Sequence, residues 1–130
     1  MEKIKVGIIG AGGYGGCGAV ELLSTHPHVE IRALMDKQDV GKPMSDLYPH
    51  LMGFCDMAIM DPDDPNCPDD FDVVFFSTPD GVGQQGALKW LKKDVKVIDY
   101  SGDFRFNVWQ SSIERKSPNP AWWATPAVLR

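Results

Sequence analysis

The chain has 130 residues and a net charge of −5, a size that forms about one domain with a hydrophobic core. The acidic balance and the lack of a basic patch argue against nucleic acid or an acidic membrane as a partner. No apolar stretch approaches the ~18 residues of a membrane-spanning helix, and no signal-peptide pattern opens the sequence. The cysteines are odd in number and lack C-x-x-C or zinc-finger spacing. We therefore expect a cytoplasmic protein with reduced thiols and no metal.

A short apolar run leads into a glycine-rich turn that opens a helix. The β-branched run at 4–9 predicts a buried parallel strand. The G-x-G-x-x-G spacing follows, at Gly10, Gly12 and Gly15. The first glycine permits a tight turn, the second lets a pyrophosphate approach the backbone, and the third lets helix and strand pack closely. The next segment keeps helical periodicity up to Pro27, so its first N–H groups would point at the phosphate. The pattern predicts a dinucleotide-binding turn, and the alternative is a glycine-rich connection in an unrelated α/β domain.

Residues 29–36 predict a second strand, which ends at Asp36. An acidic side chain about 20 residues beyond the glycine turn accepts hydrogen bonds from the adenosine ribose and favours NAD, whereas a cation there accommodates the 2′-phosphate of NADP. Asp36 and Lys37 offer both features, so these residues leave the choice of cofactor open. The alternative is that both are ordinary charges at a solvated strand end.

Residues 61–70 hold five aspartates and three prolines, which predicts a loop. The spacing of an EF-hand is absent, so we expect a solvated acidic turn rather than a calcium site. Residues 71–79 predict a buried strand that ends at Ser77, Thr78 and Pro79. Ligands of open α/β sheets bind outside the carboxyl ends of strands, so we expect these three residues beside the glycine turn. The alternative is that Ser77 caps the following turn.

A helix is expected over about residues 81–93, and a further parallel strand at 95–98. Ser101, Asp103 and Arg105 follow that strand at the same ligand-binding edge. Asp103 and Arg105 either pair with each other or contact an anionic substrate, because arginine suits carboxylate and phosphate alike. The alternation of strands and helices predicts an α/β fold, a Rossmann-like doubly wound and mostly parallel sheet with flanking helices.

Five segments resemble N-acetyl-γ-glutamyl-phosphate reductase, an arginine-biosynthesis enzyme of the semialdehyde dehydrogenase family, in order and spacing. They are GIIGAGGYGG, HPHVEIRAL, GKPMSDLYPHL, VVFFSTPDG and KVIDYSGDFRF, within residues 3–107. The resemblance implies an enzyme that uses NADPH to reduce an acyl phosphate to a semialdehyde through a cysteine thioester. It places Gly10, Gly13, Tyr14 and Gly16 on the cofactor turn. Aspartate-semialdehyde dehydrogenase, which is similar in parts, is the alternative relative.

The sequence departs from this family at three positions near the cofactor. Asp36 and Lys37 stand where the family usually has serine and arginine for the 2′-phosphate, and Asp80 stands where a histidine is common. The resemblance favours NADP, while these departures keep NAD as an alternative.

The resemblance also implies a catalytic cysteine in an N-P-G-C-Y type motif, followed by a catalytic and dimerisation domain, and neither is found in this sequence. Cys17, Cys55 and Cys67 do not match the motif, so we assign no catalytic residue. We expect a cofactor domain at residues 1–107 and an atypical tail, rich in Trp and Pro, at residues 108–130. The tail is either a truncated or frameshifted end, or a docking tail that covers apolar surface. Alone, the chain is expected to bind cofactor without turnover. The alternatives are a nucleotide-sensing module and an inert fragment, and the oligomeric state is not inferable.

Overall fold

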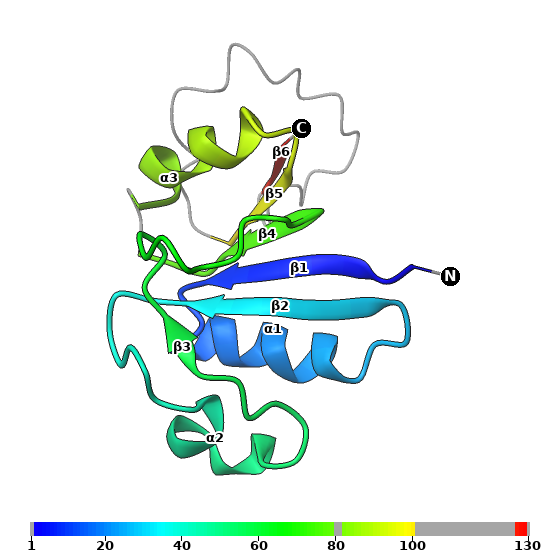
Figure 1. Ribbon diagram of the computed structural model, residues 1–130, viewed down its shortest axis with the longest axis vertical. Helices are drawn as coiled ribbons and strands as arrows, with labels where there is room; N and C mark the ends of the chain where they lie inside the picture. Colours follow the sequence, from blue (N-terminus) through cyan, green and yellow to red (C-terminus); the bar gives the residue numbers. More distant parts are fainter. Residues whose placement is uncertain (1, 80–81, 101–126, 130) are drawn as a thin grey trace, which may run out of the picture.

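The computed structural model describes residues 2–79, 82–100 and 127–129, which build one twisted sheet with helices on both faces (Figure 1). Its strand order is β3-β2-β1-β4-β5-β6. The strands are β1 (Ile4–Ile9), β2 (Val29–Met35), β3 (Ile59–Met60), β4 (Val73–Phe76), β5 (Lys96–Asp99) and β6 (Ala127–Leu129). All neighbouring pairs from β3 to β5 are parallel, and β6 pairs antiparallel with β5. This is the order of doubly wound dinucleotide-binding sheets, so the predicted Rossmann-like fold is confirmed.

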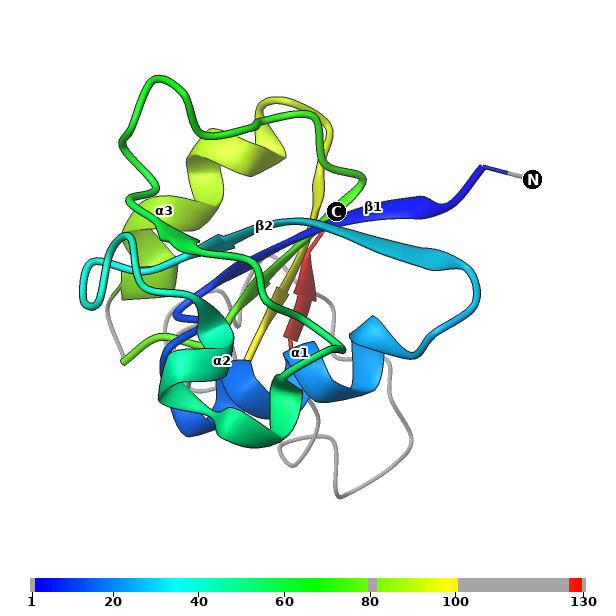
Figure 2. The same ribbon diagram turned by 60° about the horizontal axis from the view of Figure 1, so that its bottom comes forward.

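The helices connect the parallel strands and lie on opposite sides of the sheet (Figure 2). They are α1 (Tyr14–Ser24), α2 (Met44–Leu47), the 3₁₀ helix η1 (Pro49–Leu51) and α3 (Val82–Leu91). Successive side chains of a strand point to opposite faces of the sheet, so neighbouring residues pack against different helices. Ile8 packs in a cluster with α1 and α2, whereas Ile9 packs in a second cluster with Ala87 and Trp90 of α3. The sheet is thus covered on both faces, as a parallel sheet requires.

The observed elements match the sequence predictions in type and differ at their ends. The strand predicted at 71–79 is shorter, and the helix predicted at about 81–93 ends at Leu91. Asp94 follows with a φ of 61°, a left-handed conformation that stops the helix. The sequence did not predict α2, η1 or β3, which lie between residues 44 and 60.

Two further findings concern membranes and metals. Among the described residues, no helix combines the length and apolar character needed to cross a membrane. The same part of the chain holds no group of three or more His, Cys, Asp or Glu side chains placed to bind a metal ion.

Candidate dinucleotide-binding site

The glycine turn lies at the carboxyl end of β1 and holds three backbone segments together. Gly10 has a φ of 84°, and a Cβ on it would lie 2.2 Å from the carbonyl oxygen of Ser77. A Cβ on Gly16 would lie 2.3 Å from the carbonyl oxygen of Gly10. Glycine at these two positions therefore lets the end of β4 and the first turn of α1 approach the turn directly. The motif spacing predicted that Gly15 allows close packing of helix and strand, but it is Gly16 that lies against backbone atoms. A Cβ on Gly15 would instead meet the Ser77 hydroxyl, at 2.4 Å.

The start of α1 is open on the side away from the sheet. Gly13 is the N-cap residue, with φ −81° and ψ 170°, a conformation that any residue adopts. A Cβ on Gly13 would meet only the Gly10 carbonyl oxygen, at an ordinary 3.6 Å. No side-chain hydrogen bond caps this described helix, and Tyr14 and Gly15 are exposed. The first N–H groups of α1 are therefore accessible donors, at the helix end that attracts anions.

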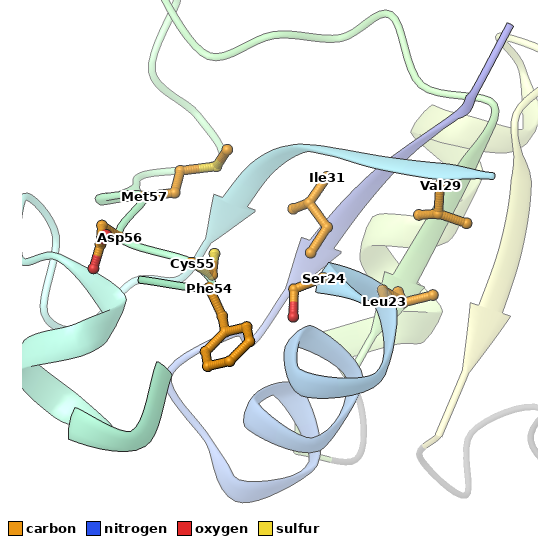
Figure 3. Close-up of a pocket in the computed structure, with 8 residues that line it drawn as sticks. All are labelled: Leu23, Ser24, Val29, Ile31, Phe54, Cys55, Asp56 and Met57. Carbon is orange, nitrogen blue, oxygen red and sulfur yellow. The ribbon is translucent and has the colours of Figure 1, made fainter. Parts of the chain in front are cut away.

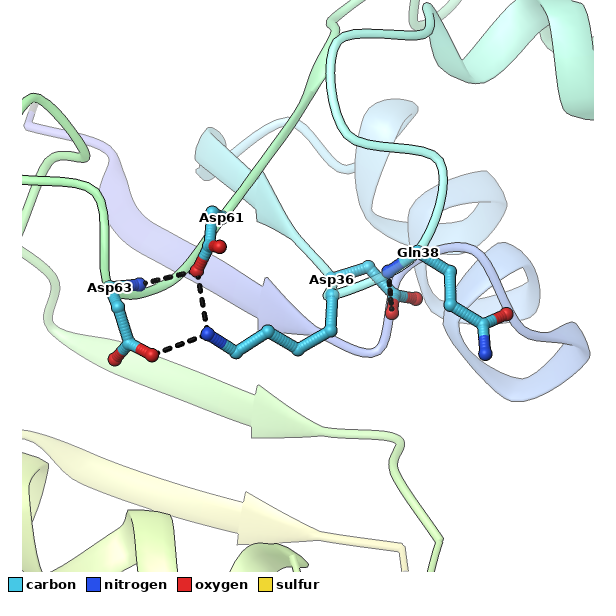
Figure 4. Close-up of polar contacts among 5 residues, drawn as sticks. Asp36, Gln38, Asp61 and Asp63 are labelled. Carbon is cyan, nitrogen blue, oxygen red and sulfur yellow. Dashed lines mark hydrogen bonds and ion pairs between the residues drawn. The ribbon is translucent and has the colours of Figure 1, made fainter.

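Asp36, directly after β2, is held against the glycine turn (Figure 4). One carboxylate oxygen accepts the N–H of Gly12 at 3.1 Å, and the other accepts the N–H of Gln38 at 3.1 Å. An ionised carboxylate has about four acceptor positions, so two remain for further donors. Asp36 thus lies beside the turn with acceptor positions left over, and its role toward the ribose hydroxyls stays a prediction.

Lys37 contacts the acidic loop that follows β3. Its ammonium group pairs with Asp61 at 2.8 Å and also with Asp63 (Figure 4). The backbone N–H of Asp63 donates to the Asp61 carboxylate at 2.9 Å, which holds that carboxylate against the loop backbone. These hydrogen bonds raise the pKa of Lys37 and lower the pKa of Asp61. Sequence reasoning placed Lys37 beside Asp36 at the cofactor, and it did not foresee the two carboxylates that bind the ammonium group.

The end of β4 completes the site. The N–H of Ser77 donates to the Ile9 carbonyl at 2.8 Å, which aligns this segment with the end of β1. The Thr78 methyl group lies 3.1 Å from the position of a Cβ on Gly10. The Thr78 hydroxyl oxygen is buried and has no hydrogen-bond partner within the described part of the chain. Ser77 and Thr78 therefore meet the glycine turn as predicted, followed by the exposed Pro79.

The buried Thr78 hydroxyl without a partner and a turn made mostly of glycine fit a bound phosphate-containing ligand. The remaining predicted positions, Ser101, Asp103 and Arg105 together with Asp80, lie outside the described residues.

Tyr48 is a site residue that sequence reasoning missed. Its hydroxyl donates to the Gly12 carbonyl at 2.9 Å, from the segment between α2 and η1. Burial raises the pKa of Tyr48, so the hydroxyl keeps its proton for this bond. Tyr48 is 36 residues away from Gly12 along the chain, and its only signal was its place in the family-like segment GKPMSDLYPHL.

None of the three cysteines has the surroundings of an activated thiol. Cys17 and Cys55 are buried and Cys67 is half-buried. Burial raises the pKa of the Cys17 thiol and of the Cys67 thiol, which favours the unreactive protonated form. The Cys17 sulfur lies 3.9 Å from Nε2 of His50, and the same nitrogen also faces the Glu21 carboxylate at 3.5 Å, so this long contact is shared with a carboxylate.

A pocket of about 450 Å³ lies at the other end of α1 (Figure 3). Its lining is mostly apolar and includes Leu23 of α1, Val29 and Ile31 of β2, and Phe54. It is formed by the beginning of β2, whereas the glycine turn meets the end of that strand. The pocket is therefore separate from the candidate dinucleotide site.

The fold and the site together define a dinucleotide-binding domain. A family model described as the semialdehyde dehydrogenase NAD-binding domain matches residues 5–128. The chain belongs to this family of NAD(P)-dependent oxidoreductases. The match includes most of the segment after residue 107 that the sequence alone marked as atypical.

Curated relatives narrow the similarity to one kind of enzyme. The chain is 43% identical over 102 residues to N-acetyl-γ-glutamyl-phosphate reductase of Laribacter hongkongensis, covering 78% of this chain and 30% of the relative. It is 44% identical over 104 residues to the reductase of Bordetella pertussis, covering 80% of this chain and 29% of the relative. The chain thus spans about three tenths of the length of these relatives. The resemblance inferred from the sequence motifs is confirmed.

Solved structures share the fold at lower identity. Aspartate semialdehyde dehydrogenase with NADP from Candida albicans aligns with a TM-score of 0.68 and 23% identity, covering 82% of this chain and 32% of that one. GenD2 from gentamicin A biosynthesis, in complex with NAD, aligns with a TM-score of 0.59 and 20% identity, covering 76% and 27%. Proteins of this fold are therefore seen with either dinucleotide.

Proposed function

We propose that this chain is the nicotinamide-dinucleotide-binding part of a reductase that converts N-acetyl-γ-glutamyl phosphate to the semialdehyde in arginine biosynthesis. The names of the relatives support the acyl phosphate as substrate, and the family match supports the cofactor. The observation that carries the proposal is Gly13, because neither its backbone conformation nor its packing requires glycine. The missing side chain leaves the start of α1 open to a pyrophosphate.

Each residue of the site has a role in holding the dinucleotide. The N–H groups at the start of α1 receive the pyrophosphate, and Asp36 accepts the ribose hydroxyls. The Thr78 hydroxyl donates to the ligand, which gives this buried group a partner. Tyr48 acts indirectly, because its bond to the Gly12 carbonyl fixes the turn. The bound cofactor supplies the hydride that reduces the acyl group.

The acyl-accepting thiolate of such a reductase is none of Cys17, Cys55 and Cys67. Their burial and the raised pKa of Cys17 and Cys67 disfavour a nucleophile, so we expect this chain alone to bind the dinucleotide without turnover. Ser101, Asp103 and Arg105 are proposed to face the substrate, because in the sequence they come after β5, whose carboxyl end lies at the ligand-binding edge of the sheet.

Two alanine variants of the same helix test the proposal. Gly13→Ala adds a methyl group where the pyrophosphate approaches, and we expect calorimetric titration with NADH to show affinity reduced by at least about tenfold. Gly18→Ala is the matched control, because a Cβ there meets nothing within 4 Å and lies further along the helix. Gly18→Ala should melt at or above the temperature of the parent, and Gly13→Ala slightly below it, because glycine is preferred over alanine at an N-cap. Unchanged affinity in Gly13→Ala would contradict the proposed site.

A further inference from the structure

The ribose end of the dinucleotide site carries an excess of negative charge. Asp36 lies at the glycine turn. Among residues 36–38, only Lys37 has a positively charged side chain. That ammonium group is bound by Asp61 and Asp63, which come from the loop after β3 (Figure 4). Two carboxylates therefore bind the one cation, and Asp36, whose N–H donates to the Met60 carbonyl just before that loop, adds a third negative charge.

The charge excess does not depend on the position of the Lys37 side chain. If the ammonium group turned toward a 2′-phosphate, Asp61 and Asp63 would lose their counterion and remain nearby. The neighbouring pair of Asp39 and Lys42, 2.7 Å apart, adds no net charge. Asp36 is also held in place, because each of its carboxylate oxygens already accepts a backbone N–H.

We propose that Asp61 and Asp63 act with Asp36 as specificity-determining residues that make this site favour NAD(H) over NADP(H); this inference rests on the proposed dinucleotide site. A ribose 2′-hydroxyl donates a hydrogen bond to a carboxylate, whereas a 2′-phosphate brings about 1.5 to 2 further negative charges. These charges would enter a field of like sign within the Debye length of about 10 Å at 0.1 M salt. This expected preference for NAD(H) differs from the use of NADP that the family resemblance favours.

Calorimetric titration of the 130-residue chain with NADH, NADPH, 5′-AMP and 2′,5′-ADP tests this inference. At low ionic strength we expect NADH to bind at least about tenfold more tightly than NADPH, and 5′-AMP more tightly than 2′,5′-ADP, because like charges placed together oppose binding. The gap should narrow as salt is raised. Equal or tighter binding of NADPH would overturn the inference while leaving the dinucleotide site intact. If a folded sample bound none of the four, the proposed function itself would fail, and the inference with it.

A double variant separates the effect of Asp61 and Asp63 on affinity from the effect of the protein's net charge. Asp61→Asn with Asp63→Asn releases Lys37, so NADPH affinity should rise by about tenfold while NADH affinity stays unchanged. Asp69→Asn is the matched control, because it lies in the same acidic loop and pairs with Lys93 at 3.0 Å instead. An equal gain in Asp69→Asn would show a general charge effect and overturn the assignment. If the double variant does not fold, as judged by circular dichroism, Asp63→Asn alone should show a smaller gain in the same direction.

Discussion

Gly10, Gly13 and Gly16 lie within seven residues, yet a side chain at each would meet different surroundings. Backbone atoms lie within 2.3 Å of a Cβ on Gly10 or Gly16, so these positions serve the fold. Gly13 has open space and an ordinary backbone conformation, so the fold does not require glycine there, and we propose that it makes room for a ligand. The sequence motif alone does not separate these roles, because spacing carries no information about which atoms approach.

Thr78 gives a prediction at the same scale. Its buried hydroxyl lacks a partner among the described residues, and an unsatisfied buried polar group costs about 1–3 kcal/mol. Thr78→Val keeps the shape and removes the hydroxyl. Chemical denaturation should therefore give an unfolding free energy equal to or above that of the parent. Titration with NADH should show affinity reduced by about 3- to 10-fold, which is the worth of one hydrogen bond. A less stable variant with unchanged affinity would mean that the hydroxyl serves the fold.

At the scale of elements, the contact between α1 and the turn after β1 positions the start of the helix, where we propose that the pyrophosphate binds. Gly16→Ala would place a methyl group 2.3 Å from the Gly10 carbonyl oxygen, a backbone atom that cannot move aside cheaply. We expect a loss of about 2 kcal/mol in unfolding free energy, since overpacking typically costs about 1–3 kcal/mol. Gly18→Ala should instead gain up to about 1 kcal/mol from helix propensity. Equal thermal stability of the two variants would contradict this packing.

Elements with strong local patterns could be predicted from the sequence, and elements that depend on distant partners could not. The strands β1, β2, β4 and β5 are apolar runs bounded by Gly, Pro or Asp, which a local pattern identifies. The strand β3 has two residues and exists through its pairing with β2. For the same reason, the contacts of Tyr48 with Gly12 and of Asp61 with Lys37 were not foreseen, because they join residues 36 and 24 positions apart.

At the scale of the whole molecule, the strand order explains why the site forms where it does. The chain passes from β1 to β2 and β3 on one side, and then returns to place β4 on the other side of β1. Ligands of open α/β sheets bind at such a reversal, outside the carboxyl ends of the strands. The glycine turn, Asp36 and Thr78 all follow strand ends at this edge. The fold class therefore predicts where the candidate site lies, even though its detailed contacts could not be predicted.

The most direct test of the account is an amide ¹H–¹⁵N NMR titration of the chain with NADH, which locates the bound dinucleotide without mutation. We predict that the largest shifts occur at the N–H groups of Tyr14 and Gly15, where the start of α1 offers accessible donors, with further shifts around Asp36. Shifts centred instead on the apolar pocket beside Leu23 and Phe54, or no shifts in a folded sample, would contradict the assignment of the glycine turn as a dinucleotide site.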